Sequence, residues 1–133
     1  MNVIISVKSE NEYLLIKASG IITNQEEHRM LTERFYTEIK KHNSKNSIID
    51  LSETSFPHSF EFLNDIVEYY SKKLPEEVKY WKIAVVDESS YLELGKYWEF
   101  IANQRGFMGY KVFSSMKGAK KFMDEYVPYK PGA

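Results

Sequence analysis

Cysteine is absent from the sequence, and its absence excludes several kinds of chemistry. Without a thiol the chain forms no disulfide, no thiolate metal site and no cysteine nucleophile, a composition that suits a reducing compartment. Long apolar runs are also missing, since no stretch reaches the ~20 apolar residues of a membrane-spanning helix. The first residues lack the basic leader and long apolar core of a signal peptide. We therefore expect a cytoplasmic protein without a membrane span.

The chain also lacks an excess of charge of either sign. Its 18 basic and 19 acidic residues give a formal net charge of -1. Nucleic-acid-binding proteins normally carry a basic excess or a basic stripe. Short lysine pairs at positions 40–41, 72–73 and 120–121 fall near the ends of predicted helices, where cations complement the helix dipole. Nucleic acid is therefore not an expected partner.

Motifs for catalysis and for metal or phosphate binding are missing as well. The three histidines, His28, His42 and His58, stand far apart, and none belongs to a ligand pattern such as His-Glu-x-x-His. The only closely spaced glycines, Gly106 and Gly109, follow a predicted helix, so they are stop signals rather than a phosphate loop. A nucleophile elbow is absent too. We expect no catalytic residue, no metal ion and no cofactor.

The pattern of apolar residues predicts strands and helices in alternation after an initial hairpin. With 133 residues, 43% of them hydrophobic, the chain is long enough for one domain with a substantial core. Short β-rich or continuously apolar runs predict strands, and apolar residues at steps of three and four predict helices. The expected strands are Val3–Val7, Glu12–Ala18, Ser47–Leu51, Lys82–Asp87 and Tyr110–Phe113. The order ββαβαβαβα implies a mostly parallel sheet with an antiparallel hairpin at its start.

Capping residues mark the starts of the expected helices. Thr23 and Glu26 have the spacing of a capping box at the first helix, where His28 is expected on an exposed face. A second capping box, Ser90–Glu93, opens the third helix, and Ser115 caps the last one.

The segment after the third strand raises one catalytic alternative. Asp50 ends this strand, where a response-regulator receiver carries its phosphoacceptor aspartate. That chemistry also needs an acidic pair after the first strand and a lysine after the last strand, and both are missing. Asp50 is therefore expected to bind loop amides. A loop from Ser52 to His58 leads into the second helix, whose apolar side is expected to comprise Phe60, Leu63, Ile66, Val67, Tyr70 and Leu74.

Two segments carry a family resemblance. Residues 48–56, Ile-Ile-Asp-Leu-Ser-Glu-Thr-Ser-Phe, are similar to the strand-Asp-Leu-Ser-x-x-x-Phe run of STAS domains, the fold of bacterial anti-sigma-factor antagonists. Residues 111–119, followed by Phe122 and Met123, look like the closing strand and helix of SpoIIAA-like proteins, a family also grouped with the lipid-binding SEC14 fold. The resemblance implies a single α/β domain, with a mixed sheet of about five strands and four helices. We expect it to span residues 1–127, followed by a flexible tail at 128–133.

The resemblance also identifies a degenerate regulatory site. In the family, an Asp-Ser-Ser-Gly run begins the helix after the third strand, and its second serine is phosphorylated. Here His58 replaces the aspartate, Ser59 matches the first serine, Phe60 replaces the phosphorylated serine and Glu61 replaces the glycine. We therefore expect no phosphoserine switch and interpret Ser59 as a helix N-cap.

Aromatic residues make up 15% of the chain, and some lie outside the expected core stripes. Tyr80 and Trp81 precede the fourth strand, while Tyr97 and Phe100 diverge from the apolar face of the third helix. Aromatic side chains with a polar tip are favoured at interfaces and pocket rims. These residues are the candidate contact surface, for a homodimer or for an apolar ligand.

The expected function is a non-enzymatic STAS-type module that binds a protein partner or a small apolar ligand. The alternatives are a lipid or small-molecule carrier, or an enzyme, either of them using a pocket that the sequence does not reveal. A domain that interacts mainly with a second copy of itself is also consistent with the sequence.

Overall fold

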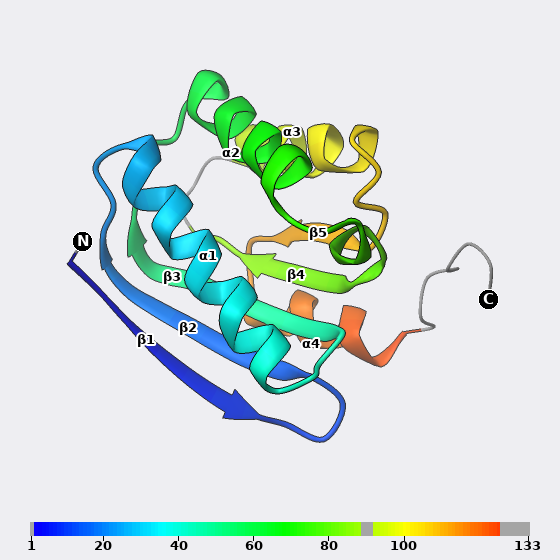
Figure 1. The fold of residues 1–133 in the computed structure, drawn as a ribbon. Coiled ribbons are helices and arrows are strands. Elements are labelled where there is room, and N and C mark those ends of the chain that lie inside the picture. Colours follow the sequence, from blue (N-terminus) through cyan, green and yellow to red (C-terminus); the bar gives the residue numbers. More distant parts are fainter. Residues whose placement is uncertain (1, 89–91, 126–133) are drawn as a thin grey trace.

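One mixed sheet forms the centre of the molecule, and helices cover both of its faces (Figure 1). The computed structural model describes residues 2–88 and 92–125. The strands are β1 (Asn2–Ser9), β2 (Leu14–Ile21), β3 (Asn46–Ser55), β4 (Lys82–Val86) and β5 (Tyr110–Phe113). The helices are α1 (Gln25–Lys41), α2 (Phe60–Lys73), the short 3-10 helix η1 (Glu76–Tyr80), α3 (Leu92–Gln104) and α4 (Met116–Asp124).

The strands lie in the order β1-β2-β3-β4-β5. β1 and β2 pair antiparallel, and each later strand pairs parallel to the one before it. Because successive parallel strands are added in one direction, right-handed connections bring α1, α2 and α3 to the same face of the sheet. Helix α4 follows the last strand and packs on the opposite face (Figure 1). The architecture confirms the predicted α/β fold with a mixed five-stranded sheet and four α-helices.

The two faces of the sheet bury separate cores. Alternation along β2 turns Leu14 and Ile16 toward the layer of α1, α2 and α3, whereas Leu15 packs on the opposite side with the α4 core. The five residues of β4 are all buried, as the sequence predicts for a strand covered on both faces. The larger core lies under α1, α2 and α3, and the candidate site is built on it.

β2 and β3 run further than the sequence predicts. β2 continues through Gly20 to Ile21, and β3 continues to Ser55 instead of giving way to a loop at Ser52. Gly20 has a φ of +145°, and a Cβ there would lie 2.0 Å from the carbonyl oxygen of Asn2. Glycine therefore allows β1 to pass close to this position, and pairing continues on both sides of β2.

Helix α1 begins one residue later than predicted. Asn24, not Thr23, is the N-cap, and its side-chain oxygen accepts a hydrogen bond from the backbone N–H of Glu27 at 2.9 Å. The Glu27 carboxylate in turn accepts hydrogen bonds from the backbone N–H and the hydroxyl of Thr23, both at 2.7 Å. Glu27 thus takes the role predicted for Glu26, because Asn24 caps better than its neighbour once the strand continues to Ile21.

Three further predictions concern the later part of the chain. Ser115 caps α4 as expected, accepting a hydrogen bond from the Gly118 N–H at 3.2 Å. The predicted cap at Ser90 and the predicted tail at 128–133 lie outside the described residues. No helix within residues 2–88 and 92–125 has both the length and the apolar character to cross a bilayer.

Candidate functional site

The loops that follow β3 and β4 meet at the carboxyl edge of the sheet. His58 Nε2, from the loop before α2, lies 3.0 Å from Asp87 Oδ2, directly after β4. Their side chains are only 15% and 9% exposed, so the pair is largely shielded from water. The His58 ring also stacks on Phe56, with the ring centroids 4.1 Å apart. The position that replaces the family's switch aspartate therefore ties two neighbouring loops together.

Ser59 caps helix α2, as the sequence predicts. Its backbone is extended, and its hydroxyl oxygen accepts a hydrogen bond from the Phe62 N–H at 3.1 Å. This bond satisfies one of the amide groups that the start of a helix leaves free.

Phe60 does not join the core, contrary to the prediction for α2. Its side chain is 54% exposed, and Phe62 is the buried phenylalanine of this turn. Phe60 meets Tyr97 of α3 edge to face instead, with centroids 4.8 Å apart. The spacing of Phe60 from Leu63 is that of two residues on one helix face. Phe60 is, however, the first residue of α2, and it contacts helix α3 instead of the sheet.

The half-buried Tyr97 and the exposed Phe100 continue this surface along α3. Asn64 donates a hydrogen bond from Nδ2 to the Tyr97 hydroxyl at 2.6 Å, so Tyr97 is held against α2. Phe100, one turn further along, is 56% exposed. We call Phe60, Tyr97 and Phe100 the aromatic face.

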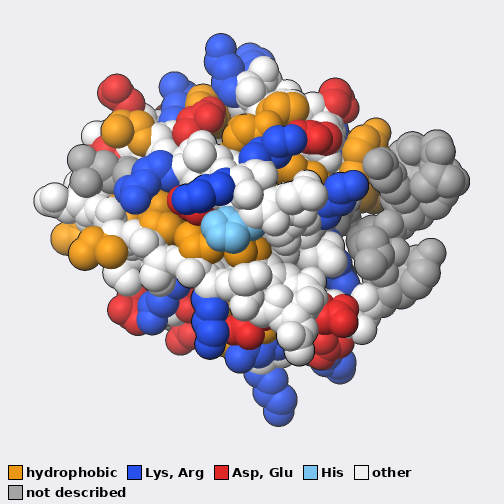
Figure 2. All heavy atoms as spheres, turned by 60° about the horizontal axis from the view of Figure 1, so that its bottom comes forward, with side chains coloured by type: hydrophobic (Ala, Val, Ile, Leu, Met, Phe, Trp, Pro, Cys, Tyr) orange, Lys and Arg blue, Asp and Glu red, His pale blue; other side chains and the backbone are white. Residues whose placement is uncertain are grey.

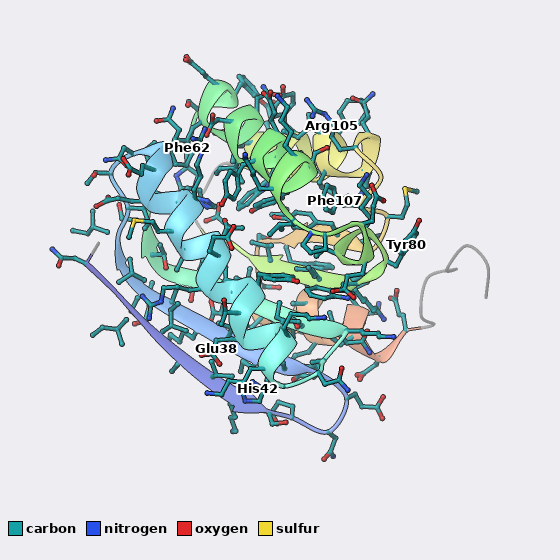
Figure 3. The ribbon with its side chains drawn as sticks, viewed as in Figure 1. Glu38, His42, Phe62, Tyr80, Arg105 and Phe107 are labelled. Carbon is teal, nitrogen blue, oxygen red and sulfur yellow. The ribbon has the colours of Figure 1, made fainter. Side chains whose placement is uncertain are left out.

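Tyr80 and Trp81 belong to other parts of the molecule. Trp81 is buried and stacks on Tyr36 of α1, with centroids 5.8 Å apart and rings 14° from parallel. Tyr80 is exposed at the end of η1, and Figure 3 shows it far from Phe62 at the start of α2. None of the ring contacts recorded for the described residues joins either side chain to the aromatic face. The single surface expected from the sequence is therefore divided into three places.

A cavity of about 50 Å³ lies in the larger core, between the sheet and the helices α1 and α2. Its walls are mostly aromatic and aliphatic, but His28, Trp98 and Tyr110 also line it. His28 Nε2 and Trp98 Nε1 are buried and have no hydrogen-bond partner among the described residues, whereas the buried Tyr110 hydroxyl interacts with that of Tyr70. Polar atoms in this state normally bind a buried water or a ligand.

His28 is buried, whereas the sequence led us to expect an exposed position. It lies edge-on to Phe56 and Phe62, with centroids at 6.1 and 5.7 Å, and Thr32 Oγ1 is 3.3 Å from its Nδ1. Burial lowers the pKa of His28 to about 4. His28 lies three residues before Leu31 and therefore on the buried side of α1. The sequence prediction gave more weight to its polar side chain than to this spacing.

The cavity carries no charge at neutral pH. His28 is neutral there because burial lowers its pKa, and burial raises the pKa of Tyr70 to about 12. Burial also raises the pKa of Tyr110, so both hydroxyls keep their protons. A ligand in this cavity must therefore be neutral as well, since a charged group would have no counter-ion.

Asp50 binds a backbone amide, as expected, although it does so within β3. Its Oδ1 accepts a hydrogen bond from the Ser52 N–H at 2.9 Å. Lys17 and Glu53 form an ion pair on the neighbouring strands.

The described residues contain no group of three or more histidine and acidic side chains arranged to hold a metal ion. Figure 2 shows basic and acidic side chains interspersed on one face of the molecule.

Comparison with solved structures identifies the fold. No family model matches the chain, and no curated protein matches it. A solved structure of an uncharacterized DUF3478-family protein with a SpoIIAA-like fold, from Shewanella loihica PV-4, is similar at 19% identity and a TM-score of 0.53, covering 91% of this chain and 93% of that one. An anti-sigma factor antagonist from Mycobacterium paratuberculosis is similar at 16% identity and a TM-score of 0.58, covering 93% and 96%. The chain thus has the SpoIIAA-like, STAS fold that its sequence resembles.

Proposed function

We propose that the chain is a non-enzymatic, cytoplasmic module whose aromatic face binds a protein partner. The observation that carries the proposal is the exposure of Phe60 and Phe100, each more than half exposed, on two helices that pack together. Exposed aromatic side chains on a rigid support are the usual centre of a protein interface. One structurally similar protein is named an anti-sigma factor antagonist, a name that implies a protein target.

The support beneath the aromatic face is rigid for identifiable reasons. Tyr97 is fixed by its contact with Phe60 and by the hydrogen bond from Asn64. The loops before α2 and α3 are joined by His58 and Asp87. A surface whose side chains are already held in place loses little conformational entropy on binding.

The charges around the aromatic face favour one kind of partner. Glu61 and Glu93 are exposed in the first turns of α2 and α3, and Lys96 is exposed one turn after Glu93. The acidic side chains outnumber the basic one. We propose a partner with an apolar centre and basic residues at its rim.

Site-specific photo-cross-linking in the native host tests this proposal. A photoreactive phenylalanine analogue at position 100 should yield one major protein adduct, and the same analogue at Met108, which is 64% exposed elsewhere, should not. The adduct at position 100 should disappear when Phe60→Ala and Tyr97→Ala are introduced together. Equal adducts at positions 100 and 108, or none at position 100, would count against the aromatic face.

The core cavity supports a second candidate function, the binding of a small neutral ligand. A volume of about 50 Å³ exceeds the ~10–15 Å³ that one water needs, yet it is smaller than the ~150 Å³ that holds benzene. An organic ligand would therefore require the half-buried Tyr36 and Leu74, which line the cavity, to move aside. The unpartnered atoms of His28 and Trp98 call for a group that both accepts and donates hydrogen bonds, as phenol does.

Thermal unfolding in the presence of phenol, and of benzene as a control, tests the second candidate. Binding in the cavity predicts that phenol raises Tm more than benzene and that His28→Leu, which removes one of the unpartnered nitrogens, narrows the difference. Equal rises in Tm with both compounds would mean that the unpartnered nitrogens do not select the ligand, and no rise with either would mean that neither binds in the cavity.

A further inference from the structure

The two edges of the sheet differ in how their outward hydrogen-bonding groups are satisfied. At the β5 edge, the Val112 N–H donates to Glu99 Oε1 at 3.0 Å. The Tyr110 carbonyl accepts from Asn103 Nδ2 at 3.1 Å, and the Tyr110 N–H donates to the Phe107 carbonyl at 3.3 Å. The chain therefore caps this edge with its own groups, which is how proteins prevent a strand from pairing with another molecule.

Within residues 2–88 and 92–125, the β1 edge has no comparable protection. Its eight residues form a long strand without proline, and among these described residues only Arg34 bonds to its outward backbone groups, donating from Nη1 to the Val3 carbonyl at 3.3 Å. Among the described residues, the outward backbone groups of Ile5 and Val7 have no recorded partner. Beside the edge, Ile4 and Ile21 are 77% and 58% exposed on the open side of the hairpin.

The hairpin register identifies which groups of β1 point outward. The Glu10 N–H donates to the Tyr13 carbonyl at 2.9 Å, which makes this the hydrogen-bonded pair next to the turn. Hydrogen-bonded pairs alternate along an antiparallel ladder, so the even residues of β1 bond to β2. The backbone groups of Val3, Ile5 and Val7 therefore face outward, in agreement with the bond from Arg34 to Val3.

We propose that β1 pairs antiparallel with β1 of a second copy of this chain, around a two-fold axis at Ile5, to form one continuous ten-stranded sheet. In this register Ile5 faces Ile5 and Val3 faces Val7, so the outward groups of Ile5 and Val7 find partners. The Val3 carbonyl, which accepts from Arg34, has a second lone pair for the Val7 N–H of the other copy. Their apolar side chains extend the larger core across the interface, because Val3, Ile5 and Val7 pack on the side of α1. Lys8 faces Asn2 of the other copy, so no like charges oppose each other.

A second copy fits this edge better than an unrelated strand does. The outward residues repeat the same apolar type about Ile5, and the arrangement is therefore self-complementary, as a two-fold interface requires. The interface lies on β1, at the end of the sheet opposite β5, and α2 and α3 are not part of it. The proposal therefore stands or fails independently of the aromatic face.

A pair of double variants tests the register. Position 4 of one copy faces position 6 of the other, and both side chains are exposed in the single chain. Ile4→Lys with Ser6→Glu places opposite charges across the interface, whereas Ile4→Glu with Ser6→Glu places like charges there. Sedimentation equilibrium should show a dimer for the wild type and for the variant with opposite charges. The variant with like charges should have a dimer dissociation constant about tenfold higher. Circular dichroism should show that both variants fold.

Hydrogen exchange gives an independent readout at low and high protein concentration. The amides of Ile5 and Val7 should become protected as the concentration rises, and those of Ile4 and Ser6 should be protected throughout because they bond to β2. A wild-type chain that stays monomeric into the hundreds of micromolar would overturn the proposal. A dimer with equal affinity in both variants, or with Ile5 and Val7 amides that exchange rapidly, would overturn it as well.

Discussion

Acidification should destabilise this fold through His28 more than through an exposed histidine. Burial lowers the pKa of His28 from an ordinary value of 6.5 to about 4, so the folded chain keeps the imidazole neutral while the unfolded chain protonates it. Between these pH values the unfolded state binds more protons, and the stability falls as the pH falls. The full difference in pKa corresponds to about 3 kcal/mol of unfolding free energy.

Urea unfolding of the wild type and of His28→Leu, followed by tryptophan fluorescence between pH 7 and pH 3, measures this contribution. Other groups also titrate in this range, so the informative quantity is the difference between the two proteins. Relative to His28→Leu, the wild type should lose about 3 kcal/mol of unfolding free energy as the pH falls, and this loss should level off below pH 4. His42→Leu is the matched control, because His42 is exposed at the end of α1 beside Glu38 (Figure 3). Parallel pH curves for wild type and His28→Leu would refute the reasoning.

Three more predictions test local features of the fold. Ser59→Ala should lower the unfolding free energy by about 1 kcal/mol in urea titrations, and Ser59→Asp should retain most of it, because both serine and aspartate cap helices. Gly109→Ala should lower the unfolding free energy by about 2 kcal/mol, because a Cβ there would lie 2.4 Å from the Trp81 carbonyl oxygen. At Gly95 the nearest atom to an added Cβ lies at 3.4 Å, so Gly95→Ala should not destabilise α3. Equal melting temperatures for the two variants would contradict this prediction. Lys82 Nζ donates to the Glu125 carbonyl at 2.9 Å, and burial lowers the pKa of Lys82. The unfolding free energy should therefore rise with pH between this lowered pKa and 10.5, because the unfolded chain binds more protons in this range. Lys82→Met should lack this rise, and identical pH dependence in the wild type and in Lys82→Met would contradict the prediction.

The order of elements and the two faces of the sheet could be predicted because they depend on apolar periodicity. The apolar spacing after each strand predicted the helices, and Ser59 and Ser115 were recognisable as caps from their residue type. The β2 and β3 ends could not be predicted, since they depend on the approach of β1 to Gly20, a contact between distant parts of the chain.

The candidate site was only partly predictable. The exposure of Phe100 followed from its place on the helix, but Phe60 was assigned to the core and Trp81 to a surface, and the structure reverses both. Helical spacing shows which residues share a face, while tertiary packing decides how far that face is covered. The pairing of His58 with Asp87 joins residues 29 positions apart, and no local pattern signals it.

The central claim, that the aromatic face binds a protein partner, is tested most directly by calorimetric titration of the protein captured at position 100. The wild type, Phe100→Ala and Met108→Ala should each be titrated with this purified partner. Truncating a residue at the centre of an interface commonly costs about tenfold or more in affinity. We predict that loss for Phe100→Ala and an unchanged Kd for Met108→Ala, whose side chain is also more than half exposed but lies outside the aromatic face. Equal affinities for all three proteins would contradict the proposed function.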